Sequence, residues 1–377
     1  MTGRITDILP SAYAVLGLAG ADRLDLAERV GGARRIVLVL VDGLGYHLLP
    51  RAAESSGFLA DVHAGRIGHL DRLECTLPST TPTSLVSLGT GVLPGEHGIL
   101  GFTLNIPGTD RLLTHILWRD DPPPERWQPV PTVFTLGSAA GIGSSVVLPA
   151  MFAGSGLTRA AYGGADFIGL NKGGDDQVDA IVRALHNGSS FVFGYTAAVD
   201  TAAHAHGIAS EKWAAAAAYA GQLLERLVAA LPADTALLVT ADHGGLDVPP
   251  TARVDIGADA QLTAGVRVVA GEPRFRYLHT EPGATDDVCA AWQAMLGTTA
   301  DVLTREEAVA SGLFGSMRPE HLPRIGDVVV ISTGDSAVLA TGYEPPEVAK
   351  LVGFHGARTP EETAIPLITF AADKRIA

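Results

Sequence analysis

Residues 36–43 read Ile-Val-Leu-Val-Leu-Val-Asp-Gly, an unbroken apolar run that stops at an acidic residue and a glycine. A run of β-branched and leucine side chains without polar alternation is typical of a parallel strand that is covered on both faces. Runs of the same form recur at 145–148, 190–195 and 235–239, and each is bounded by Gly, Pro, Asn or Asp. These runs are the candidate strands of a buried parallel sheet.

Helical patterns separate the candidate strands. Residues 175–186 have a helical pattern that closes at Asn187-Gly188, and residues 211–231 form an alanine-rich pattern that Pro232 stops. Strands that alternate with helices favour an α/β fold. The sequence therefore predicts a central, mainly parallel sheet with helices on both faces.

The pattern of apolar runs and helical stretches changes after residue 245. Short strand-like runs and one clear helical stretch follow, at 266–270, 275–278, 327–332 and, for the helix, 286–296. We interpret residues 246–343 as an inserted α+β cap subdomain, and residues 1–245 plus 344–377 as the core domain. After the insertion, residues 353–356 and the apolar residues 365–370 are expected to return to the main sheet.

The composition narrows the classes of function. The 377 residues include 27 basic and 41 acidic side chains, a net charge of −14 without a basic stripe, so binding to a nucleic-acid polymer is not expected. The hydrophobic content of 47% is enough for a substantial core. Only two cysteines occur, Cys75 and Cys289, too few for a disulfide framework or a thiolate zinc site.

Two segments of the sequence give information about the cellular compartment of the protein. The first residues, Met-Thr-Gly-Arg-Ile-Thr-Asp, lack the basic start and long apolar core of a secretory signal. Residues 127–158 are uncharged and long enough to span a bilayer, but Pro129, Pro131 and Pro149 interrupt them, so a soluble segment is favoured. We therefore expect a cytoplasmic protein with no membrane partner.

Polar side chains stand directly after the candidate strands. In open α/β sheets, ligands bind outside the carboxyl ends of the strands, so a site is expected at these positions. The candidates are Asp42 after the first run, Asp200 and His204 after the third, Asp242 and His243 after the fourth, and His355 after the insertion. Each alone has an ordinary explanation, since Asp commonly caps a helix. Together, carboxylates and imidazoles suit zinc or a similar divalent ion.

Asp200 and His204 are four residues apart, which places them on one face if the turn between them is helical. Such a pair can hold a single cation. Surface or packing roles are assigned to the histidines without a comparable setting, which are His47, His63, His69, His115, His186, His279 and His321. The roles of His97 and His206 stay open. His206 has either an indirect supporting role beside the site or no role in it.

A hydroxyl-rich segment supplies a candidate nucleophile. Residues 77–85 read Leu-Pro-Ser-Thr-Thr-Pro-Thr-Ser-Leu, and Thr90-Gly91 follows shortly after. Ser and Thr ahead of an apolar stretch, with Pro82 in the first turn, indicate the start of a helix. Capping explains one hydroxyl, but a helix N-terminus also attracts anions, so a phosphate and a threonine nucleophile could meet there. Without a metal or a base, threonine is a weak nucleophile.

Five separated motifs occur in one order along the chain. They are Asp42-Gly, the Thr81 helix start with Thr90-Gly91, Asp200-x-x-x-His204, Asp242-His243-Gly244 and Gly353-Phe-His355-Gly. This set resembles the alkaline phosphatase superfamily and, within it, the nucleotide pyrophosphatase/phosphodiesterase branch; the phosphonoacetate hydrolases are similar too. The likeness covers residues 36–102, 191–245 and 352–370, and the insertion resembles the cap-like insertions of that branch.

The resemblance implies two zinc ions and a nucleophilic threonine. One ion would be held by Asp200, His204 and His355, and the other by Asp42, Asp242 and His243, with Thr81 as its additional ligand and as the nucleophile. The implied reaction is hydrolysis of phosphodiester or nucleotide pyrophosphate bonds in small-molecule phosphate esters or nucleotides, through a phospho-threonine intermediate. A phosphomonoesterase or phosphonate hydrolase on the same metals is the alternative. A metal-binding protein without turnover is a third reading, and the intact Thr81 argues against it.

The choice of threonine follows from spacing within the family pattern. In the family, the nucleophile precedes the Thr-Gly pair by nine residues, and counting back from Thr90 gives Thr81. Thr76 begins a segment that matches part of the Thr-x-Pro-Asn pattern of the diesterases. Thr80 would take the position of the nucleophile if one extra residue stood before Thr90. Thr81 is therefore preferred, with Thr80 as its closest rival.

One position departs from the family pattern. The diesterases have an asparagine 21 residues after the nucleophile, where this chain has Phe102, while Asn105 is out of register. Lys172, in an Asn-Lys-Gly-Gly segment, is a candidate to supply a positive charge to the substrate. Because Phe102 and its neighbours Ile99 and Leu100 can pack against a base or an aryl group, we expect aryl or nucleotidyl diesters to be preferred over the matching monoesters.

Overall fold

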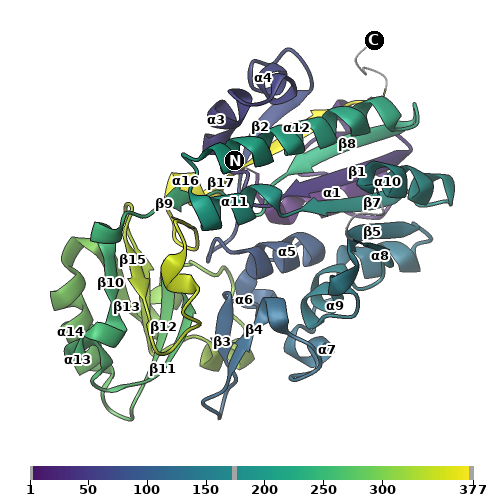
Figure 1. Ribbon diagram of the computed structural model, residues 1–377. Helices are drawn as coiled ribbons and strands as arrows, with labels where there is room; N and C mark the ends of the chain where they lie inside the picture. The colour runs from purple at the N-terminus through teal and green to yellow at the C-terminus, as the bar shows by residue number, and fades with distance from the viewer. Residues whose placement is uncertain (1–2, 172–175, 373–377) are drawn as a thin grey trace.

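A computed structural model describes residues 3–171 and 176–372, and its main feature is a seven-stranded sheet (Figure 1). Across the sheet the strands are β2 (His69–Glu74), β17 (Ala364–Phe370), β8 (Thr235–Thr240), β1 (Arg35–Val41), β7 (Phe191–Thr196), β5 (Ser144–Pro149) and β6 (Asp166–Leu170). Only β17 runs antiparallel to its neighbours in this sheet of the described chain. The predicted mainly parallel sheet is confirmed.

Helices cover both faces of the sheet (Figure 1). One group packs around α5 (Thr81–Thr90) and consists of α1 (Ile5–Val15), α8 (Val133–Ala139) and α9 (Gly156–Tyr162). The other packs around α12 (Glu211–Ala230) and consists of α3 (Leu49–Ala53), α4 (Gly57–His63), α10 (Gln177–His186) and α11 (Ala198–His206). The two predicted helices at 175–186 and 211–231 are thus α10 and α12.

Strand β1 lies at the centre of the core. Residues 36–41 are completely buried, which is why their sequence has no polar alternation. In the parallel register, Leu40 pairs with both Tyr195 of β7 and Thr240 of β8. The carboxyl ends of the three strands therefore meet at one edge, and the residues that follow them are brought together.

The insertion contains a second, antiparallel sheet, seen beside the main sheet in Figure 1. Its strands in order are β11 (Val266–Glu272), β12 (Phe275–Thr280), β14 (Val328–Ser332) and β13 (Ala300–Thr304), and α14 (Thr285–Leu296) packs against β13 and β14. A further parallel pair joins β10 (Arg253–Asp255) to β15 (Ala337–Leu339). These elements lie inside the predicted cap, 246–343, whose exact limits remain a prediction.

The return from the insertion differs from the expectation in one respect. Residues 365–370 do enter the main sheet, as β17, but Gly353 and Phe354 form the short strand β16 (Gly353–Phe354), which pairs with β9 (Leu246–Asp247). The edge of β8 that could have received β16 is already paired with β17. The expectation that residues 353–356 join the main sheet was therefore wrong.

The insertion is joined to the core by buried polar contacts. Arg274, in the turn after β11, donates to both carboxylate oxygens of Glu362 at 2.6 and 2.8 Å, and both side chains are fully buried. Tyr277 donates to the carbonyl of Leu100 at 2.6 Å. Strand β11 is consequently held against the short hairpin of β3 (Thr103–Asn105) and β4 (Leu112–Thr114).

The uncharged stretch at 127–158 folds as part of the α/β core. It includes α8 and β5, and its prolines lie between such elements or at their ends. Within residues 3–171 and 176–372, no helix has the length and apolar character that a bilayer span requires. Both cysteines are buried and free.

Candidate metal centre and active site

A first group of ligand-type side chains follows β1 and β8. Nε2 of His243 lies 3.6 Å from Oδ1 of Asp42 and 3.4 Å from Oδ2 of Asp242, and all three residues are buried. The other carboxylate oxygens are engaged, because Tyr195 donates to Oδ2 of Asp42 and the backbone N–H groups of Gly43 and His243 donate to Oδ1 of Asp242 at 3.1 Å. Oδ1 of Asp42 and Oδ2 of Asp242 are buried without a hydrogen-bond partner. Two bare carboxylate oxygens and one imidazole nitrogen thus converge, which fits a divalent cation.

A second group consists of Asp200, His204 and His355. Asp200 and His204 lie on α11, so the predicted helical turn is confirmed, and Nε2 of His204 is 3.2 Å from Oδ2 of Asp200. Nε2 of His355 lies 3.2 Å from Nε2 of His204 and 3.9 Å from Oδ1 of Asp200. Two imidazole nitrogens face one carboxylate at distances that a shared cation would bridge.

The second nitrogen of each imidazole is held by the backbone. Nδ1 contacts a carbonyl oxygen in all three cases: Gly353 for His204 at 2.8 Å, Gly244 for His243 at 2.8 Å and Ser79 for His355 at 2.9 Å. Because a carbonyl only accepts, Nδ1 carries a hydrogen in each ring, and Nε2 is the nitrogen that faces the cluster and would bind a cation. This is the support that metal-bound histidines use.

The two groups adjoin each other through His243. Its ring stacks on that of His355, with centroids 3.6 Å apart and the planes at 17°. Ligand atoms of Asp200, His243 and His355 lie within 4.8 Å of one another, as do those of Asp42, Asp242 and His243. All six predicted ligands are therefore in one cluster, and His243 is within reach of both parts.

Charge is unbalanced within the cluster. Burial raises the pKa of Asp42 well above its usual range, and the negative charges of Asp242 and Asp200 add to this effect. Burial opposes ionisation of Asp200 and His204 too, but their mutual attraction outweighs it, lowering the pKa of Asp200 and raising that of His204 to about 9. A bound cation would relieve the repulsion between the buried carboxylates.

Thr81 is the first residue of α5, and its Oγ1 lies 3.1 Å from Nε2 of His243. The rivals are placed differently. The hydroxyl of Thr80 is fully buried on the side of Glu272, and that of Thr76 is buried 3.5 Å from the hydroxyl of Ser87. Of the three threonines, Thr81 is the one whose hydroxyl contacts a predicted metal ligand.

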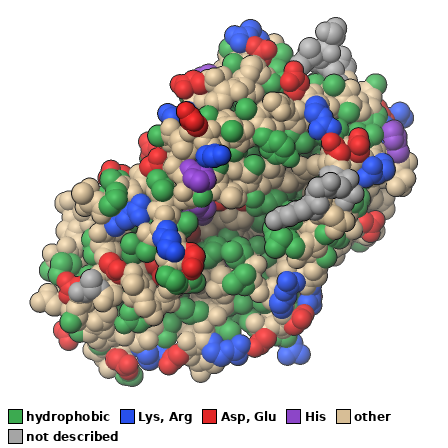
Figure 2. Space-filling model, viewed as in Figure 1, with side chains coloured by type: hydrophobic (Ala, Val, Ile, Leu, Met, Phe, Trp, Pro, Cys, Tyr) green, Lys and Arg blue, Asp and Glu red, His purple; other side chains and the backbone are tan. Residues whose placement is uncertain are grey.

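Phe102 lines an apolar pocket of about 380 Å³ that also includes His204 and His355. Its neighbours Ile99 and Leu100 are completely buried in the core, so they do not contribute to that wall as expected. Lys172 lies outside the described residues. Figure 2 shows a hollow with hydrophobic side chains on its floor and histidine at its edge.

Two residues near the cluster were not anticipated. Glu272 ends β11 and is buried, with Oε2 3.8 Å from Nδ1 of His355 and with Oε1 unpartnered. Burial raises its pKa to about 8, although Thr80 and Arg276 act in the opposite direction. Tyr195, the donor to Asp42, ends the apolar run 190–195. The signal for both was the same, a polar side chain at the end of a strand.

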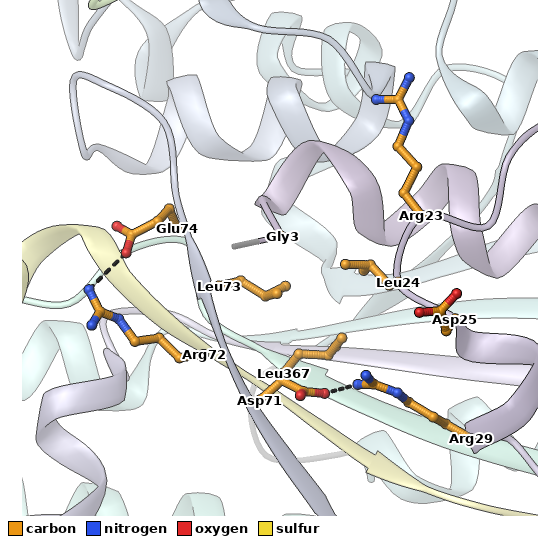
Figure 3. Close-up of a pocket in the computed structure, with 10 residues that line it drawn as sticks. All are labelled: Gly3, Arg23, Leu24, Asp25, Arg29, Asp71, Arg72, Leu73, Glu74 and Leu367. Atoms are coloured by element: carbon orange, nitrogen blue, oxygen red, sulfur yellow. Dashed lines mark hydrogen bonds and ion pairs between the residues drawn. The ribbon is translucent and has the colours of Figure 1, made fainter. Parts of the chain in front are cut away.

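A larger hollow, of about 680 Å³, lies beside the edge strand β2 and is lined by none of the predicted site residues (Figure 3). Its three arginines are all paired: Arg29 with Asp71 and Arg72 with Glu74 at 2.8 Å, as Figure 3 shows, and Arg23 with Asp7 at 3.3 Å. Size alone is therefore a poor guide here. The cluster of carboxylates and imidazoles is the candidate active site.

The fold, together with this Asp/His cluster at the carboxyl edge of the sheet, defines the chain as a member of the alkaline phosphatase superfamily. More narrowly, residues 36–358 match the family model described as type I phosphodiesterase / nucleotide pyrophosphatase, and the chain belongs to that family. The resemblance inferred from the five motifs is confirmed. Membership assigns the chain to enzymes that hydrolyse phosphoester or phosphonate bonds. No match was found among curated protein sequences.

Solved structures share the fold. Murine ectonucleotide pyrophosphatase/phosphodiesterase 5, inactive and in complex with AMP, has a TM-score of 0.72 at 16% identity, covering 90% of this chain and 88% of its own. The human counterpart gives 0.69 at 15% identity, with 89% and 88% covered. Phosphonoacetate hydrolase from Sinorhizobium meliloti 1021, in complex with phosphonoacetate, gives 0.65 at 19% identity, with 90% of each chain covered.

Proposed function

We propose that the protein is a zinc-dependent phosphodiesterase that works through a phospho-threonine intermediate. The observation that carries the proposal is the contact between Oγ1 of Thr81 and Nε2 of His243, next to the bare oxygens of Asp42 and Asp242. A hydroxyl at the start of a helix, beside a site built for a cation, is the arrangement that activates an alcohol as a nucleophile.

Two divalent ions fit the donors. Asp42, Asp242 and His243, with Thr81, would hold one; Asp200, His204 and His355 would hold the other. Mixed carboxylate and imidazole donors suit zinc. When bound, the ions would supply positive charge that favours the alkoxide of Thr81 and stabilises the phosphoryl oxygens.

The chain's own groups prepare the reaction. Oγ1 of Thr81 lies 3.1 Å from Nε2 of His243, so the hydroxyl stands beside the nitrogen that would bind an ion, and the N-terminal end of α5 favours the anionic substrate. The Thr81 hydroxyl gives its proton to solvent, and Oγ1 attacks phosphorus. As the bond from Oγ1 to phosphorus forms, the bond from phosphorus to the leaving oxygen breaks, and that oxygen keeps the electron pair and takes a proton from solvent. Water then cleaves the bond to Oγ1, which restores the threonine and releases a phosphate monoester.

Diesters are the proposed substrates because positive donors are scarce. Phe102 cannot donate to a second anionic oxygen, and Arg276, which lines the adjoining pocket, is already paired with Glu344 at 2.6 Å. A dianionic monoester needs more such donors than a monoanionic diester. Likeness to phosphonoacetate hydrolase supports phosphonate hydrolysis as the second candidate on the same site.

A rate panel tests the proposal. We expect a 4-nitrophenyl phosphodiester to be hydrolysed with a higher kcat/KM than the matching monoester and phosphonate, at one pH with zinc saturating. A tenfold preference for the monoester, about 1.4 kcal/mol in transition-state stabilisation, would replace the diesterase assignment. A Phe102→Asn variant should shift the ratio toward the monoester, because it supplies a donor where the ring stood.

A further inference from the structure

The exposed hydrophobic side chains are unevenly distributed. Eight large ones are exposed in the described parts of the chain, and four of them line the pocket beside the metal cluster: Leu112, Ile116, Leu117 and Tyr343. Leu117 is 74% exposed and Tyr343 44%. Single exposed apolar residues need no explanation, but a group gathered around one hollow marks a binding surface.

The pocket lies between the core and the insertion. The segment around β4 supplies Leu112 and Leu117, and the insertion supplies Val269 and Tyr343 opposite them. At about 380 Å³ it lies within the range of roughly 300–1,000 Å³ that is usual for small-molecule sites. Its hydrophobic lining appears as the green floor of the hollow in Figure 2.

The charges on its walls disfavour an anionic occupant. Arg276, the one basic side chain among the described residues that line the pocket, donates to Glu344 at 2.6 Å and to the carbonyl of Val338 at 2.9 Å. Glu272 adds a buried carboxyl, with Oε2 3.8 Å from Nδ1 of His355. Thus no arginine or lysine among the described lining residues is free to pair with a pyrophosphate group.

The position of the pocket indicates which part of a substrate it receives. His204 and His355 line it, whereas Thr81 lines a separate, smaller hollow with Leu85 and Tyr195. In an in-line displacement, the leaving oxygen departs on the side opposite the nucleophile. The pocket therefore lies on the side of the leaving group.

We propose that the leaving group is an uncharged, elongated apolar alcohol or phenol, which this pocket binds. The proposal rests on the proposed function and deepens it, by assigning the substrate class. It also excludes nucleoside triphosphates as good substrates, because their leaving group is a polyanion.

A series of methyl phosphodiesters with para-alkylphenol leaving groups tests the proposal. The alkyl group runs from methyl through butyl and hexyl to octyl, which changes apolar length but hardly changes phenol acidity. Phenol release is measured below the micellar concentration, with ATP and a 4-nitrophenyl diester as reference substrates. We expect kcat/KM to rise by about two- to four-fold per added methylene while the chain stays within the pocket.

A double variant, Leu117→Ser with Tyr343→Ser, tests whether the effect of chain length arises in this pocket. The matched control is Leu136→Ser, at an exposed leucine of α8 outside the pocket. The octyl-to-methyl ratio of kcat/KM should fall in the double variant and keep its wild-type value in the control. A ratio near one in the wild type, an unchanged ratio in the double variant, or a preference for ATP over the octyl ester would overturn the proposal. If the enzyme turned over neither the alkylphenyl series nor the 4-nitrophenyl diester, that result would instead contradict the proposed function.

Discussion

The carboxyl edge of the main sheet and the wall of the insertion that faces it are built on different principles. At the sheet edge, the ligand-type side chains are held in place by the backbone: each of the three histidines contacts a carbonyl, and Asp242 accepts from two N–H groups. The facing wall is mainly hydrophobic, and its arginine, Arg276, is paired with Glu344. We infer that the sheet edge sets the chemistry and that the insertion sets the choice of substrate.

The largest effect is expected from Thr81. Thr81→Ala should lower kcat by about a thousand-fold or more, because the attacking oxygen is lost, while bound metal stays. Thr81→Ser should keep part of the activity, since a hydroxyl remains. Thr80→Ala and Thr76→Ala are the controls and should be mild; loss of turnover in either would place the nucleophile at that residue.

Metal content tests the sheet edge directly. Metal analysis after gentle purification should give about two zinc equivalents per chain, and the Asp242→Asn, His243→Ala double variant should lose about one of them, because two of the donors of one ion are gone. Removing zinc with a chelator should abolish activity, and zinc should restore it. A folded, active sample with background zinc would contradict the two-ion assignment.

The buried ion pair that joins the insertion to the core can be tested on its own. Arg274→Met leaves the fully buried Glu362 without its partner, so the free energy of unfolding should fall by about 3–5 kcal/mol. Arg358→Met removes an exposed pair with Asp301 and should cost less than about 1 kcal/mol. Urea unfolding of both variants gives the comparison, and equal small losses would show that the insertion is held by its apolar contacts instead.

A smaller effect is expected from Tyr195, which acts through Asp42. Tyr195→Phe removes the hydrogen bond to Oδ2 of Asp42 and keeps the ring, so zinc affinity should fall about 10- to 100-fold. Added zinc should then restore kcat. Tyr219→Phe, at an exposed position on α12, is the control. Unchanged zinc affinity in Tyr195→Phe would mean that the hydroxyl does not orient the carboxylate.

Much of the core could be predicted because its strands are buried on both faces. The run 36–41 and its three counterparts are continuous apolar segments, and each became a strand. Strands β2 and β6 escaped notice because they are the edges of the sheet, where side chains are partly exposed and polar residues such as Asp71 and Arg72 are tolerated. The pairing of β16 with β9 depends on contacts far apart in sequence, which no local pattern contains.

The site also contains some residues that local sequence patterns predict and others that they do not. The six ligand-type residues follow strands or the insertion at recognisable positions, and the fold brings all of them together. Glu272 also stands at the end of a strand, but that position alone does not place it beside His355, which depends on how the insertion packs on the core. For the same reason, Ile99 and Leu100 were wrongly expected beside Phe102: the turn of the chain buries both.

The order of the ligands along the chain has a consequence for biosynthesis. Five of the six stand before residue 246, but His355 comes only after the whole insertion, on a segment that β9 and Ser79 hold in place. A nascent chain therefore emerges from the ribosome with an incomplete set of donors. The proposed second cation site would be complete only when the last part of the family-matched region, which ends at residue 358, has been translated and has folded back onto the first.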